Sequence, residues 1–466
     1  MKGKTIGVVI TDGVGSRNFI LSKFISEVSL AFENVVVFSG IPISGMNNIE
    51  FPSNVKVVEL PLYIENKSVW FFRKLKELAH MYLHRDYYGI NDNLTRGYPN
   101  TNSLRSLLTK LAYAITKLFH SENNIKFYEK LQFYCFKKDK VTQEFKVLLN
   151  NESPDILFFT HQRPPFLAPL LYLAKTLKIK TNSFIFSWDN LASKGRMLGE
   201  FDGYMVWSDL MKKELLHFYP STISKNVKVV GTPQFEPYVQ DEYFITREEF
   251  YNKFKLDSSK KTICYSCADA DIGRNDEVHI RSVWSYIKKN SLENLQLLIR
   301  TSPAEDGKRF EQLKAEIPEI KWNVPKWILA REGHAEAWSQ RLPSIEDVKD
   351  LRAILAYCEV NVNMLSTMSL DFMLFDKPVI NTVFGNKENG LYDDQKFLNY
   401  AHYKYVVDSE AVTIAKNEKE LHEQLEEAIK NPSLRKTKRK ALLDLEIGAP
   451  LEGTSQRIVK ELKQLA

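Results

Sequence analysis

Residues 362–380, VNMLSTMSLDFMLFDKPVI, combine an apolar strand, a cluster of hydroxyl residues, an apolar helix and the start of another apolar run. A strand that turns directly into a helix is the repeating unit of α/β sheets. The hydroxyl residues Ser366, Thr367 and Ser369 stand at the junction between strand and helix. Unpaired backbone N–H groups and the positive end of the helix dipole meet there, so the junction predicts an anion site.

Asp371 lies in the first turn of the predicted helix, two residues beyond Ser369. Its carboxylate would repel phosphate but can accept hydrogen bonds from a ribose diol, as acids do in nucleotide-binding folds. A phosphate site beside a sugar-binding acid predicts a nucleoside diphosphate ligand. The alternative interpretation is structural: Ser366 or Thr367 caps the helix, and Asp371 favours its N-terminus.

Apolar strands alternate with helical periodicity along nearly the whole chain, which predicts α/β layers around parallel sheets. With 466 residues, the chain exceeds the size of a single hydrophobic core. Gly231, Pro233 and Pro237 interrupt the alternation near its middle and predict a hinge. We therefore predict two Rossmann-like domains, at 1–232 and 240–445, that face each other across a cleft, and a C-terminal helix at 446–466 that could pack back on the first domain. The predicted strands are 5–10, 34–38, 55–60, 156–160, 182–186, 203–207, 227–230, 261–267, 295–300, 360–365, 377–383 and 403–407.

The composition, 44% hydrophobic and 26% charged, is that of an ordinary globular chain. Four cysteines give no disulfide framework, and the N-terminus reads as a strand and not as a signal peptide. No apolar run reaches the roughly 18 residues that a membrane span requires. We therefore expect a cytoplasmic location.

The net charge of +6 is unevenly distributed along the chain. The segment 67–140 carries 14 Lys/Arg against 6 Asp/Glu and interrupts the first domain with amphipathic helical patterns. Basic amphipathic helices can lie at an anionic membrane surface or against a lipid-linked substrate. This segment predicts a helical insertion with peripheral contact to the inner face of the cytoplasmic membrane. The alternative is that its apolar faces simply pack on the sheet.

Two further strand ends in the second half carry polar residues. Ser266 lies at the end of the strand at 261–267 and Arg274 follows that strand, and Arg300 ends the strand at 295–300, where a guanidinium can bind a diphosphate. Trp327, in WNVPKW, is a candidate to hold a nucleotide base. Because the carboxyl ends of parallel strands share one edge, we expect these residues to face the same ligand. Each also has a structural alternative, as a surface arginine or a core aromatic.

Taken in order along the chain, these stretches resemble the donor domain of a known family. They are VVGTPQF (229–235), RTSP (300–303), LSTMSLDFMLFDKPVI (365–380) and AHYKYVVDSEAVTIAKNEKEL (401–421), followed by Asn431 and Pro432. The resemblance is to the two-Rossmann-domain (GT-B) glycosyltransferases of bacterial surface polysaccharide synthesis and to the related CDP-glycerol glycerophosphotransferases. In that pattern the position of Asp371 is usually a Glu that binds the donor ribose, so the shorter side chain here departs from it.

The resemblance implies a metal-independent transferase without a cofactor, which uses a nucleotide sugar as co-substrate. The C-terminal domain would hold this donor, and the N-terminal domain would hold a glycan or lipid-linked acceptor. Closure about 231–237 would assemble the site, and no nucleic-acid partner is expected. Helix dipoles and cationic side chains would then stabilise the departing diphosphate.

Strand ends in the first half supply candidates for the base that such a transfer needs. Asp12, Gly13 and Gly15 follow the strand at 5–10 and offer a carboxylate beside an approachable backbone. Resembling inverting enzymes have their base near this loop, so Asp12 is the first candidate. His161 and Arg163 follow the strand at 156–160, and His161 is an alternative base. The structural alternative for Asp12 is a simple Asp-Gly turn.

A third strand end, FIFSWDNLASKGR, adds more candidates for acceptor binding. Trp188 is a candidate platform for sugar stacking. Asp189 is another alternative base, and Asn190 and Lys194 are candidate acceptor contacts. For each of these residues a structural role is also open, and the cluster is better supported than any member.

Two patterns imitate metal sites. Asp269-Ala270-Asp271 is similar to the metal-binding acid pair of single-domain (GT-A) glycosyltransferases, but that pair would be expected early in the chain and not at the start of a second domain. Cys264 and Cys267 lie in one strand, where their side chains point to opposite faces, and no second Cys/His pair accompanies them. We therefore expect no metal.

The sequence as a whole predicts a glycosyltransferase that moves a sugar from a nucleotide-sugar donor to a glycan or lipid-linked acceptor. One alternative is a transferase of polyol phosphate from a CDP-alcohol such as CDP-glycerol, which would use the same phosphate-binding edge. Another is an epimerase that acts on the nucleotide sugar without any acceptor. A third alternative, from another class, is a non-catalytic scaffold in a polysaccharide assembly complex.

Overall fold

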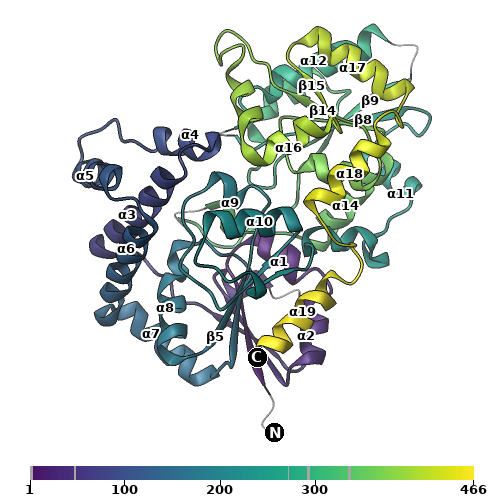
Figure 1. Cartoon of the computed structure of the whole chain (residues 1–466). Coiled ribbons are helices and arrows are strands. Elements are labelled where there is room, and N and C mark those ends of the chain that lie inside the picture. The colour runs from purple at the N-terminus through teal and green to yellow at the C-terminus, as the bar shows by residue number, and fades with distance from the viewer. Residues whose placement is uncertain (1–3, 47–48, 271, 291–293, 334–336) are drawn as a thin grey trace. The chain divides into compact units, whose positions relative to one another are not determined.

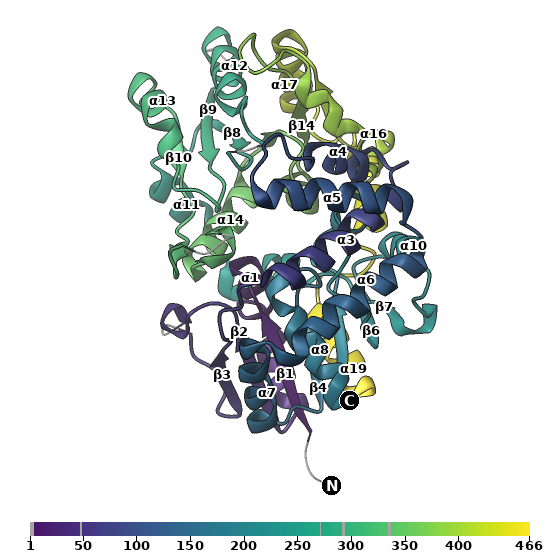
Figure 2. The same cartoon turned by 90° about the vertical axis from the view of Figure 1, so that its left-hand side faces the viewer.

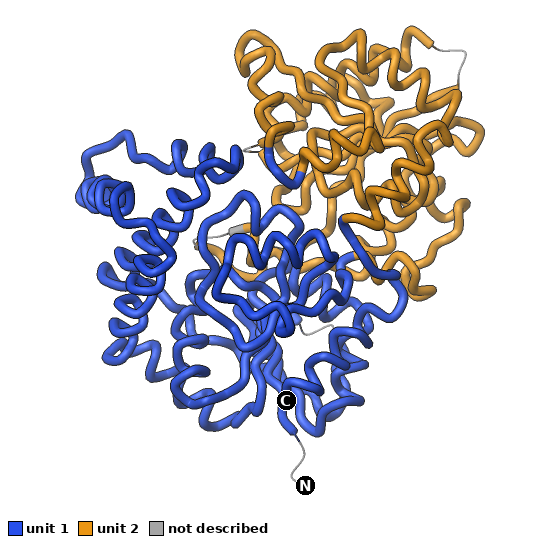
Figure 3. The backbone as a smooth tube through the Cα atoms, viewed as in Figure 1, with its two compact units in different colours: residues 1–234, 400–402, 446–466 blue, residues 235–399, 403–445 orange. Residues whose placement is uncertain are grey.

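The structure is a computed structural model, and it describes residues 4–46, 49–270, 272–290, 294–333 and 337–466. The chain divides into two compact units (Figure 3). The first unit comprises residues 1–234, 400–402 and 446–466, and the second comprises residues 235–399 and 403–445. The chain passes between them after residue 234, within the segment that contains Gly231, Pro233 and Pro237.

The first unit is built on a seven-stranded parallel sheet with the order β3-β2-β1-β4-β5-β6-β7. Its central strands are continuous apolar runs, TIGVVI in β1 and ILFF in β4, and are buried almost throughout. Such runs suit a parallel sheet because helices cover both of its faces. The strands are β1 (Thr5–Ile10), β2 (Asn34–Ser39), β3 (Val55–Glu59), β4 (Ile156–Phe159), β5 (Lys180–Phe184), β6 (Gly203–Val206) and β7 (Val227–Val229).

The second unit contains a six-stranded parallel sheet with the order β10-β9-β8-β13-β14-β15. A short antiparallel pair, β11 and β12, lies apart from it. The strands are β8 (Lys261–Ser266), β9 (Leu295–Arg300), β10 (Lys321–Asn323), β11 (Ile328–Leu329), β12 (Arg341–Leu342), β13 (Val360–Asn363), β14 (Val379–Thr382) and β15 (Thr413–Ala415).

Each sheet has a topological switch point, where the order of strands along the chain reverses. In the first unit it lies between β1 and β4, and in the second unit it lies between β8 and β13. Open α/β sheets bind ligands outside the carboxyl ends of the strands at such points. The strand orders therefore indicate one edge of each sheet as a candidate ligand site.

Helices α3, α4, α5 and α6 lie together on one side of the first unit (Figures 1 and 2), and α3 contacts both α5 and α6. They occupy most of the basic segment 67–140 and share a small apolar core. Among the described residues, no helix combines the length and hydropathy of a membrane span. The helices of this unit are α1 (Gly13–Phe19), α2 (Phe24–Ala31), α3 (Lys67–Leu83), α4 (Tyr88–Arg96), α5 (Leu104–Leu118), α6 (Glu122–Cys135), α7 (Lys140–Glu152), α8 (Ala168–Leu177), α9 (Asn190–Ser193), α10 (Asp209–Phe218) and α19 (Thr454–Leu465).

In the second unit, α12 and α17 lie side by side and bury apolar residues against one face of the sheet (Figure 1). Helix α14 contacts α11. The helices are α11 (Arg247–Phe254), α12 (Asp276–Lys289), α13 (Glu311–Glu316), α14 (Ile345–Tyr357), α15 (Met368–Leu374), α16 (Ala401–Ser409), α17 (Glu418–Lys430) and α18 (Lys436–Glu446). The first two residues of α16 and the last residue of α18 belong to the first unit.

A cluster of phenylalanines fixes α1 on the first sheet. The ring of Phe19 meets Phe24, Phe158 and Phe184 edge to face, with centroids 5.2, 5.5 and 5.4 Å apart. Such arrangements stabilise beyond the area they bury, by about 0.5–1.5 kcal/mol per pair. The helix that Asp12 caps is therefore docked on β4 and β5.

One predicted strand is wrong. YKYVV, at 403–407, lies in helix α16, and the strand that pairs with β14 is β15. Aromatic and β-branched residues gave this segment the composition of a strand. In the structure Tyr403 and Val406 are buried, at the spacing of three that a helix face requires.

The last helix, α19, packs against α2 of the first unit. The chain reaches it past Glu446, which is 4% exposed, and Gly448. Gly448 has a φ of +68°, and a Cβ there would lie 2.7 Å from the Cα of Ser208, so glycine is required. Burial raises the pKa of Glu446 to about 8, and the charge of Glu214 adds to the effect.

Candidate active site

At the switch point of the first unit, the loops after β1 and β4 bring Asp12 and His161 together. The two strands are direct neighbours in the sheet, and each residue stands two positions beyond the end of its strand. His161 Nδ1 lies 3.1 Å from Asp12 Oδ2. Asp12 is 1% exposed and His161 is 7% exposed. Two residues predicted from separate strand ends thus form one pair.

Three hydrogen-bond donors hold the Asp12 carboxylate. Oδ1 accepts the backbone N–H of Gly15 at 2.7 Å and so caps α1, which begins at Gly13. Oδ2 accepts the Thr11 hydroxyl at 2.9 Å as well as His161 Nδ1. Charge-assisted bonds of this kind fix the orientation of a carboxylate. The geometry therefore favours Asp12 as the group that positions His161, and His161 as the base.

The imidazole of His161 is held on its face as well as at Nδ1. Its ring stacks on Phe186, with centroids 4.0 Å apart and an angle of 11° between the planes. With Nδ1–H donated to a carboxylate, Nε2 carries the lone pair. Within the described part of the chain, Nε2 has no hydrogen-bond partner. An oriented imidazole with an open Nε2 has the geometry of a general base.

Asp189, after β5, forms a second polar group with Asn190 and Lys194. Asn190 Nδ2 donates to Asp189 at 2.9 Å, and Lys194 Nζ lies 3.4 Å from Asp189 Oδ2. Burial raises the pKa of Asp189, but the charge of Lys194, with further contributions that include the hydrogen bond from Asn190, outweighs it and holds the pKa well below its usual value. Asp189 therefore stays ionised and is a weak base. Gln162 donates to Asn190 at 3.0 Å and joins this group to the β4 loop.

Trp188, the predicted stacking platform, is 4% exposed. Its ring meets the ring of His402 edge to face at 5.1 Å. Burial lowers the pKa of His402 to about 4, so this imidazole is neutral at pH 7. A sugar stacks only on an open ring face, and the accessibility of Trp188 in this structure gives that role no support.

Arg163 lies two residues beyond His161 and is half-buried. Its Nε is buried and has no hydrogen-bond partner among the described residues. A buried donor without a partner costs about 1–3 kcal/mol. Such a cost is commonly explained by a ligand or water that the group binds, so Arg163 is a candidate ligand contact.

The switch point of the second unit carries a strained turn. Leu365, two residues beyond β13, has a φ of +49°, which a bulky side chain rarely adopts. Asn363 Oδ1 accepts the backbone N–H of Ser366 at 2.8 Å and supports this turn. Ser366 and Thr367 follow it and are half-buried. Strained backbone of this kind is concentrated at functional sites, and these two hydroxyl residues are partly accessible there.

Ser266 and Ser369, in contrast, are buried in a network of amides. Asn361 Nδ2 donates to Ser266 Oγ at 2.8 Å, and Asn381 Nδ2 donates to Ser369 Oγ at 3.2 Å. The Tyr403 hydroxyl donates to Asn381 Oδ1 at 2.7 Å. Buried polar groups that satisfy one another make the core specific and rigid. These two serines therefore stabilise the turn from the buried core beside it.

Arg300 and Trp327 converge on Asp347. Two guanidinium nitrogens of Arg300 each lie 3.0 Å from an Asp347 oxygen, and Trp327 Nε1 donates to Asp347 at 2.8 Å. Arg300 and Asp347 are both buried. A bidentate pair already neutralises this guanidinium, so in this structure Arg300 is not open to a diphosphate.

Asp347→Asn is expected to lower the free energy of unfolding by about 3 kcal/mol, because it leaves the buried Arg300 charge without its counter-ion. Urea unfolding followed by tryptophan fluorescence measures the change. The double variant Arg300→Met/Asp347→Leu removes both charges and should lose less than the single variant. Asp306→Asn, at an exposed acid of the same unit, is the matched control and should stay within about 0.5 kcal/mol of the wild type. If Asp347→Asn were as stable as the wild type, the buried pair of Arg300 and Asp347 would not contribute this free energy of unfolding.

Asp371 and Arg274 differ in accessibility. Asp371 is buried and accepts a hydrogen bond from the Tyr238 hydroxyl, so a ribose would share this carboxylate with a tyrosine. Arg274 is exposed in the loop between β8 and α12. The loop thus offers an accessible cation at the same edge as the strained turn.

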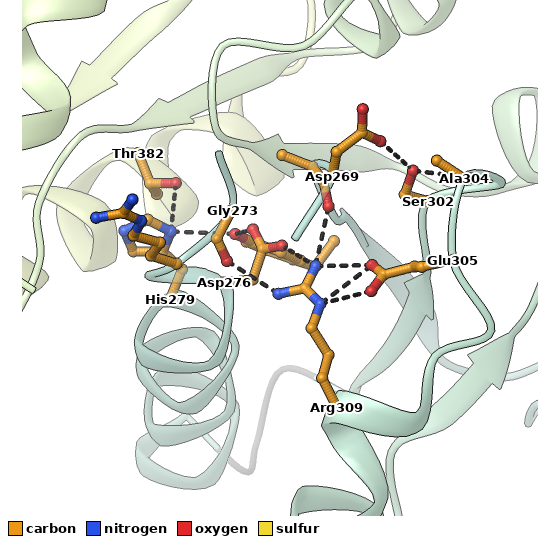
Figure 4. Close-up of polar contacts among 12 residues, drawn as sticks. Asp269, Gly273, Asp276, His279, Ser302, Ala304, Glu305, Arg309 and Thr382 are labelled. Atoms are coloured by element: carbon orange, nitrogen blue, oxygen red, sulfur yellow. Dashed lines mark hydrogen bonds and ion pairs between the residues drawn. The ribbon is translucent and has the colours of Figure 1, made fainter. Parts of the chain in front are cut away.

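Arg309 organises the β8–α12 loop (Figure 4). Its guanidinium donates to the carbonyls of Ala268 and Gly273, at 2.9 Å each, and to Asp276 Oδ2 at 2.7 Å. Nε binds Glu305 at 2.9 Å. One side chain from the loop after β9 therefore ties both ends of the β8 loop. The sequence predictions did not include Arg309, and its only local signal is the acid four residues before it.

Asp276 and His279 lie on the first turn of α12 and are fully buried (Figure 4). The Tyr265 hydroxyl donates to Asp276 at 2.7 Å and lies 3.0 Å from His279 Nδ1. Burial raises the pKa of Asp276 to about 6, against the bonds from Arg309 and Tyr265, and burial lowers the pKa of His279 to about 4. His279 is thus neutral at pH 7. The spacing i, i+3 in NDEVH, which puts both on one helix face, is the signal that could have found them.

The Asp269–Asp271 pair and the Cys264–Cys267 pair are the two sequence patterns that imitate metal sites. Asp271 lies outside the described residues, and Asp269 accepts a hydrogen bond from the Ser302 hydroxyl (Figure 4). Cys264 and Cys267 are buried free thiols. In the described part of the chain, no three His, Cys, Asp or Glu side chains form a group suited to a metal ion.

Two parallel sheets, each in a Rossmann-like domain, give the chain a GT-B fold. Neither a protein-family model nor a curated protein matches the sequence. Among solved structures, the UDP-GlcNAc 2-epimerase from Neisseria meningitidis bound to UDP-GlcNAc matches with a TM-score of 0.53 and 11% identity, over 99% of this chain and 100% of that chain. The S. aureus MnaA–UDP structure matches with a TM-score of 0.54 and 12% identity, over 99% and 96%. The wall teichoic acid polymerase TagF, as a variant with CDPG, matches with a TM-score of 0.50 and 11% identity, over 99% and 88%.

These likenesses confirm the predicted fold class and the resemblance to GT-B structures that include TagF. The identities, from 11% to 12%, show the fold alone. One fold of this kind hosts many chemistries, so the activity depends on the residues at the two switch points.

Proposed function

We propose that the chain is a GT-B-type transferase that moves a group from a nucleoside-diphosphate-linked donor to an acceptor hydroxyl, with a nucleotide sugar as the first candidate donor. The observation that carries this proposal is the Asp12–His161 pair at the switch point of the first unit. A transfer of this kind needs a base for the hydroxyl and cationic or dipolar groups for the departing diphosphate. The first unit has candidates for the base, and the second unit has candidates for the groups that stabilise the diphosphate.

On the acceptor side, His161 takes the proton of the attacking hydroxyl on Nε2. Asp12 keeps the required tautomer through its bond to Nδ1 and stabilises the imidazolium that forms. The buried, unpaired Nε–H of Arg163 binds an oxygen of a glycan or lipid-linked acceptor. A positioned base contributes about 10²–10⁴-fold to the rate.

On the donor side, Ser366 and Thr367 bind the diphosphate with their hydroxyls, and Arg274 neutralises it. The partial exposure of the two hydroxyl residues and the strained turn at Leu365 support this assignment. The named ligands of the similar structures, UDP, UDP-GlcNAc and CDPG, are compatible with a nucleotide-linked donor.

Two alternative activities use the same edge of the second unit. A glycerophosphotransferase would take CDP-glycerol in place of a nucleotide sugar, as the TagF likeness suggests. An epimerase would act on the nucleotide sugar alone, as the likeness to the Neisseria meningitidis enzyme suggests. The His161 base serves all three reactions, so the donor and the product decide between them.

A panel of UDP-, GDP-, CMP- and dTDP-linked sugars and CDP-glycerol, tested by thermal shift and then by product analysis, separates these activities. Nucleotide release that depends on an added acceptor glycan supports sugar transfer. Stabilisation by CDP-glycerol alone supports glycerophosphotransfer, and an epimerised sugar formed without acceptor supports the epimerase. Failure of every compound to raise the melting temperature would overturn the nucleotide-linked proposal in favour of a scaffold.

Thr367→Val is expected to weaken donor binding about tenfold, because it removes a hydroxyl bond to a charged phosphate at nearly constant volume. Isothermal titration with the donor that the panel identifies measures the change in Kd. Thr437→Val, at an exposed position on α18, is the matched control and should bind as the wild type does. An unchanged Kd for Thr367→Val would remove this residue from the donor site.

A further inference from the structure

Helix α5 has its amphipathic faces reversed relative to an ordinary surface helix. The side chains that it buries in the first unit are mostly polar or small: Ser106, Thr109, Ala112, Tyr113 and Thr116. The side chains that it exposes include Leu104, Leu107, Leu111 and Leu118, which are 49% to 75% exposed. A helix that serves only its own core would turn these leucines inward.

The buried polar face of α5 is fully bonded, so this orientation is internally consistent. The hydroxyls of Thr109 and Thr116 donate to the carbonyls of Arg105 and Ala112, at 2.8 and 2.7 Å. The Tyr113 hydroxyl donates to the Leu94 carbonyl in α4 at 2.7 Å. The two threonine bonds lie within α5 and satisfy these hydroxyls in any orientation of the helix, whereas rotating the helix to bury its leucines would break the Tyr113 bond to α4. The exposure of the leucines therefore follows from the way in which α5 packs on the first unit.

The exposed leucines form one continuous stripe, which we call the α5 leucine stripe (Leu104, Leu107, Leu111 and Leu118). Successive spacings of three, four and seven residues keep them on one face of the helix. At 1.5 Å per residue the stripe extends for about 21 Å along the helix axis. A contiguous apolar stripe of this length on a surface marks a site of interaction.

The charged residues in the sequence on and next to α5 are all basic. From residue 93 to residue 121 the sequence has Arg96, Arg105, Lys110 and Lys117 and no Asp or Glu. Long basic side chains beside an apolar face can extend to the headgroups of a lipid layer while the leucines enter its surface. A second copy of this chain is a poor occupant, because its own segment 67–140 carries the same excess, 14 Lys/Arg against 6 Asp/Glu.

We propose that the α5 leucine stripe docks the protein on a lipid bilayer that carries anionic headgroups, with α5 lying in the plane of the membrane surface. The leucines supply the apolar insertion, and Arg105, Lys110 and Lys117 supply the attraction to the headgroups. The inference concerns membrane binding alone, so it holds for any activity of the two switch points.

Flotation of the full chain with vesicles of phosphatidylglycerol and phosphatidylcholine tests this surface. The wild type is expected to float with these vesicles and much less with phosphatidylcholine alone. The variant Leu107→Gln/Leu111→Gln/Leu118→Gln should lose binding at least about tenfold. The variant Arg105→Gln/Lys117→Gln should also lose about tenfold, and added salt should weaken the wild type. All substituted side chains are exposed, and far-UV circular dichroism checks the fold.

A matched control changes three leucines of similar exposure elsewhere: Leu30→Gln/Leu62→Gln/Leu434→Gln. This variant should float as the wild type does. Wild-type protein that stays with the unbound fraction, or a triple α5 variant that floats normally, overturns the proposal. Sedimentation velocity adds a third outcome: a dimer that the α5 variant abolishes would assign the stripe to a second copy and also overturn it.

Discussion

His161→Asn is expected to lower kcat by about 10²–10⁴-fold and to leave the donor Kd within about twofold of the wild type. The asparagine amide can still donate to Asp12 from the position of Nδ1, so the loop keeps its shape. The lone pair of Nε2 is lost, and with it the group that accepts the acceptor proton. Initial rates with the donor from the nucleotide panel give kcat, and isothermal titration gives the Kd.

Asp12→Asn should cause a comparable loss, because an amide at this position favours the wrong tautomer of His161. The double variant should be hardly slower than the slower single variant, since residues that act as a unit give non-additive losses. His217→Asn, at an exposed histidine of the same unit, is the matched control and should keep wild-type activity. If His161→Asn turned over normally, the base would have to be sought elsewhere, and the proposal for this pair would be withdrawn.

The stability of the first unit is expected to fall as the pH rises from about 5 to 8, by roughly 4 kcal/mol through Glu446 alone. Burial raises the folded-state pKa of this carboxyl from 4.5 to about 8. Between these two values the unfolded chain releases the proton and the folded chain retains it, so ionisation favours unfolding. Below about pH 4.5 both states are protonated, and the loss disappears. Urea unfolding at pH 5, 7 and 8.5 measures the slope.

Glu446→Gln should flatten this pH dependence and make the protein more stable than the wild type at pH 8. The neutral amide reproduces the shape of the protonated acid without the cost of a buried charge. Glu452→Gln, at an exposed acid in the same C-terminal segment, is the matched control and should keep the wild-type slope. A Glu446→Gln variant with an unchanged slope would show that this carboxyl is ionised in the folded state.

Most strands could be predicted because parallel strands covered on both faces are continuous apolar runs. TIGVVI and LQLLIR begin and end where the sequence indicated. YKYVV failed because aromatic and β-branched residues also suit a helix whose buried positions are three apart, and burial is a property of the tertiary structure. Local composition therefore predicts buried parallel strands better than short helices of similar residues.

At the candidate site, the meeting of Asp12 and His161 could be predicted from the rule that parallel strands end at one edge. Which of the two takes the proton could not, because it depends on the three donors to Asp12. Arg300 and Ser369 were predicted to meet a ligand, since the sequence does not show that Asp347 and Asn381 already bind them. A pattern of polar residues at strand ends does not show how deeply each side chain is buried or which distant residues it binds.

The discontinuous first unit has a consequence for the synthesis of this protein. Its last segment, 446–466, includes α19, whose buried Ile458, Val459 and Leu462 complete a core that α2 begins near the N-terminus. The second unit has all of its residues once position 445 has left the ribosome, whereas the first still lacks residues 446–466 at that point. Maturation thus runs opposite to the usual N-to-C order of nascent domains. A chain truncated before residue 446 would contain the whole second unit joined to an incomplete first unit, whose unfinished core would expose it to proteolysis.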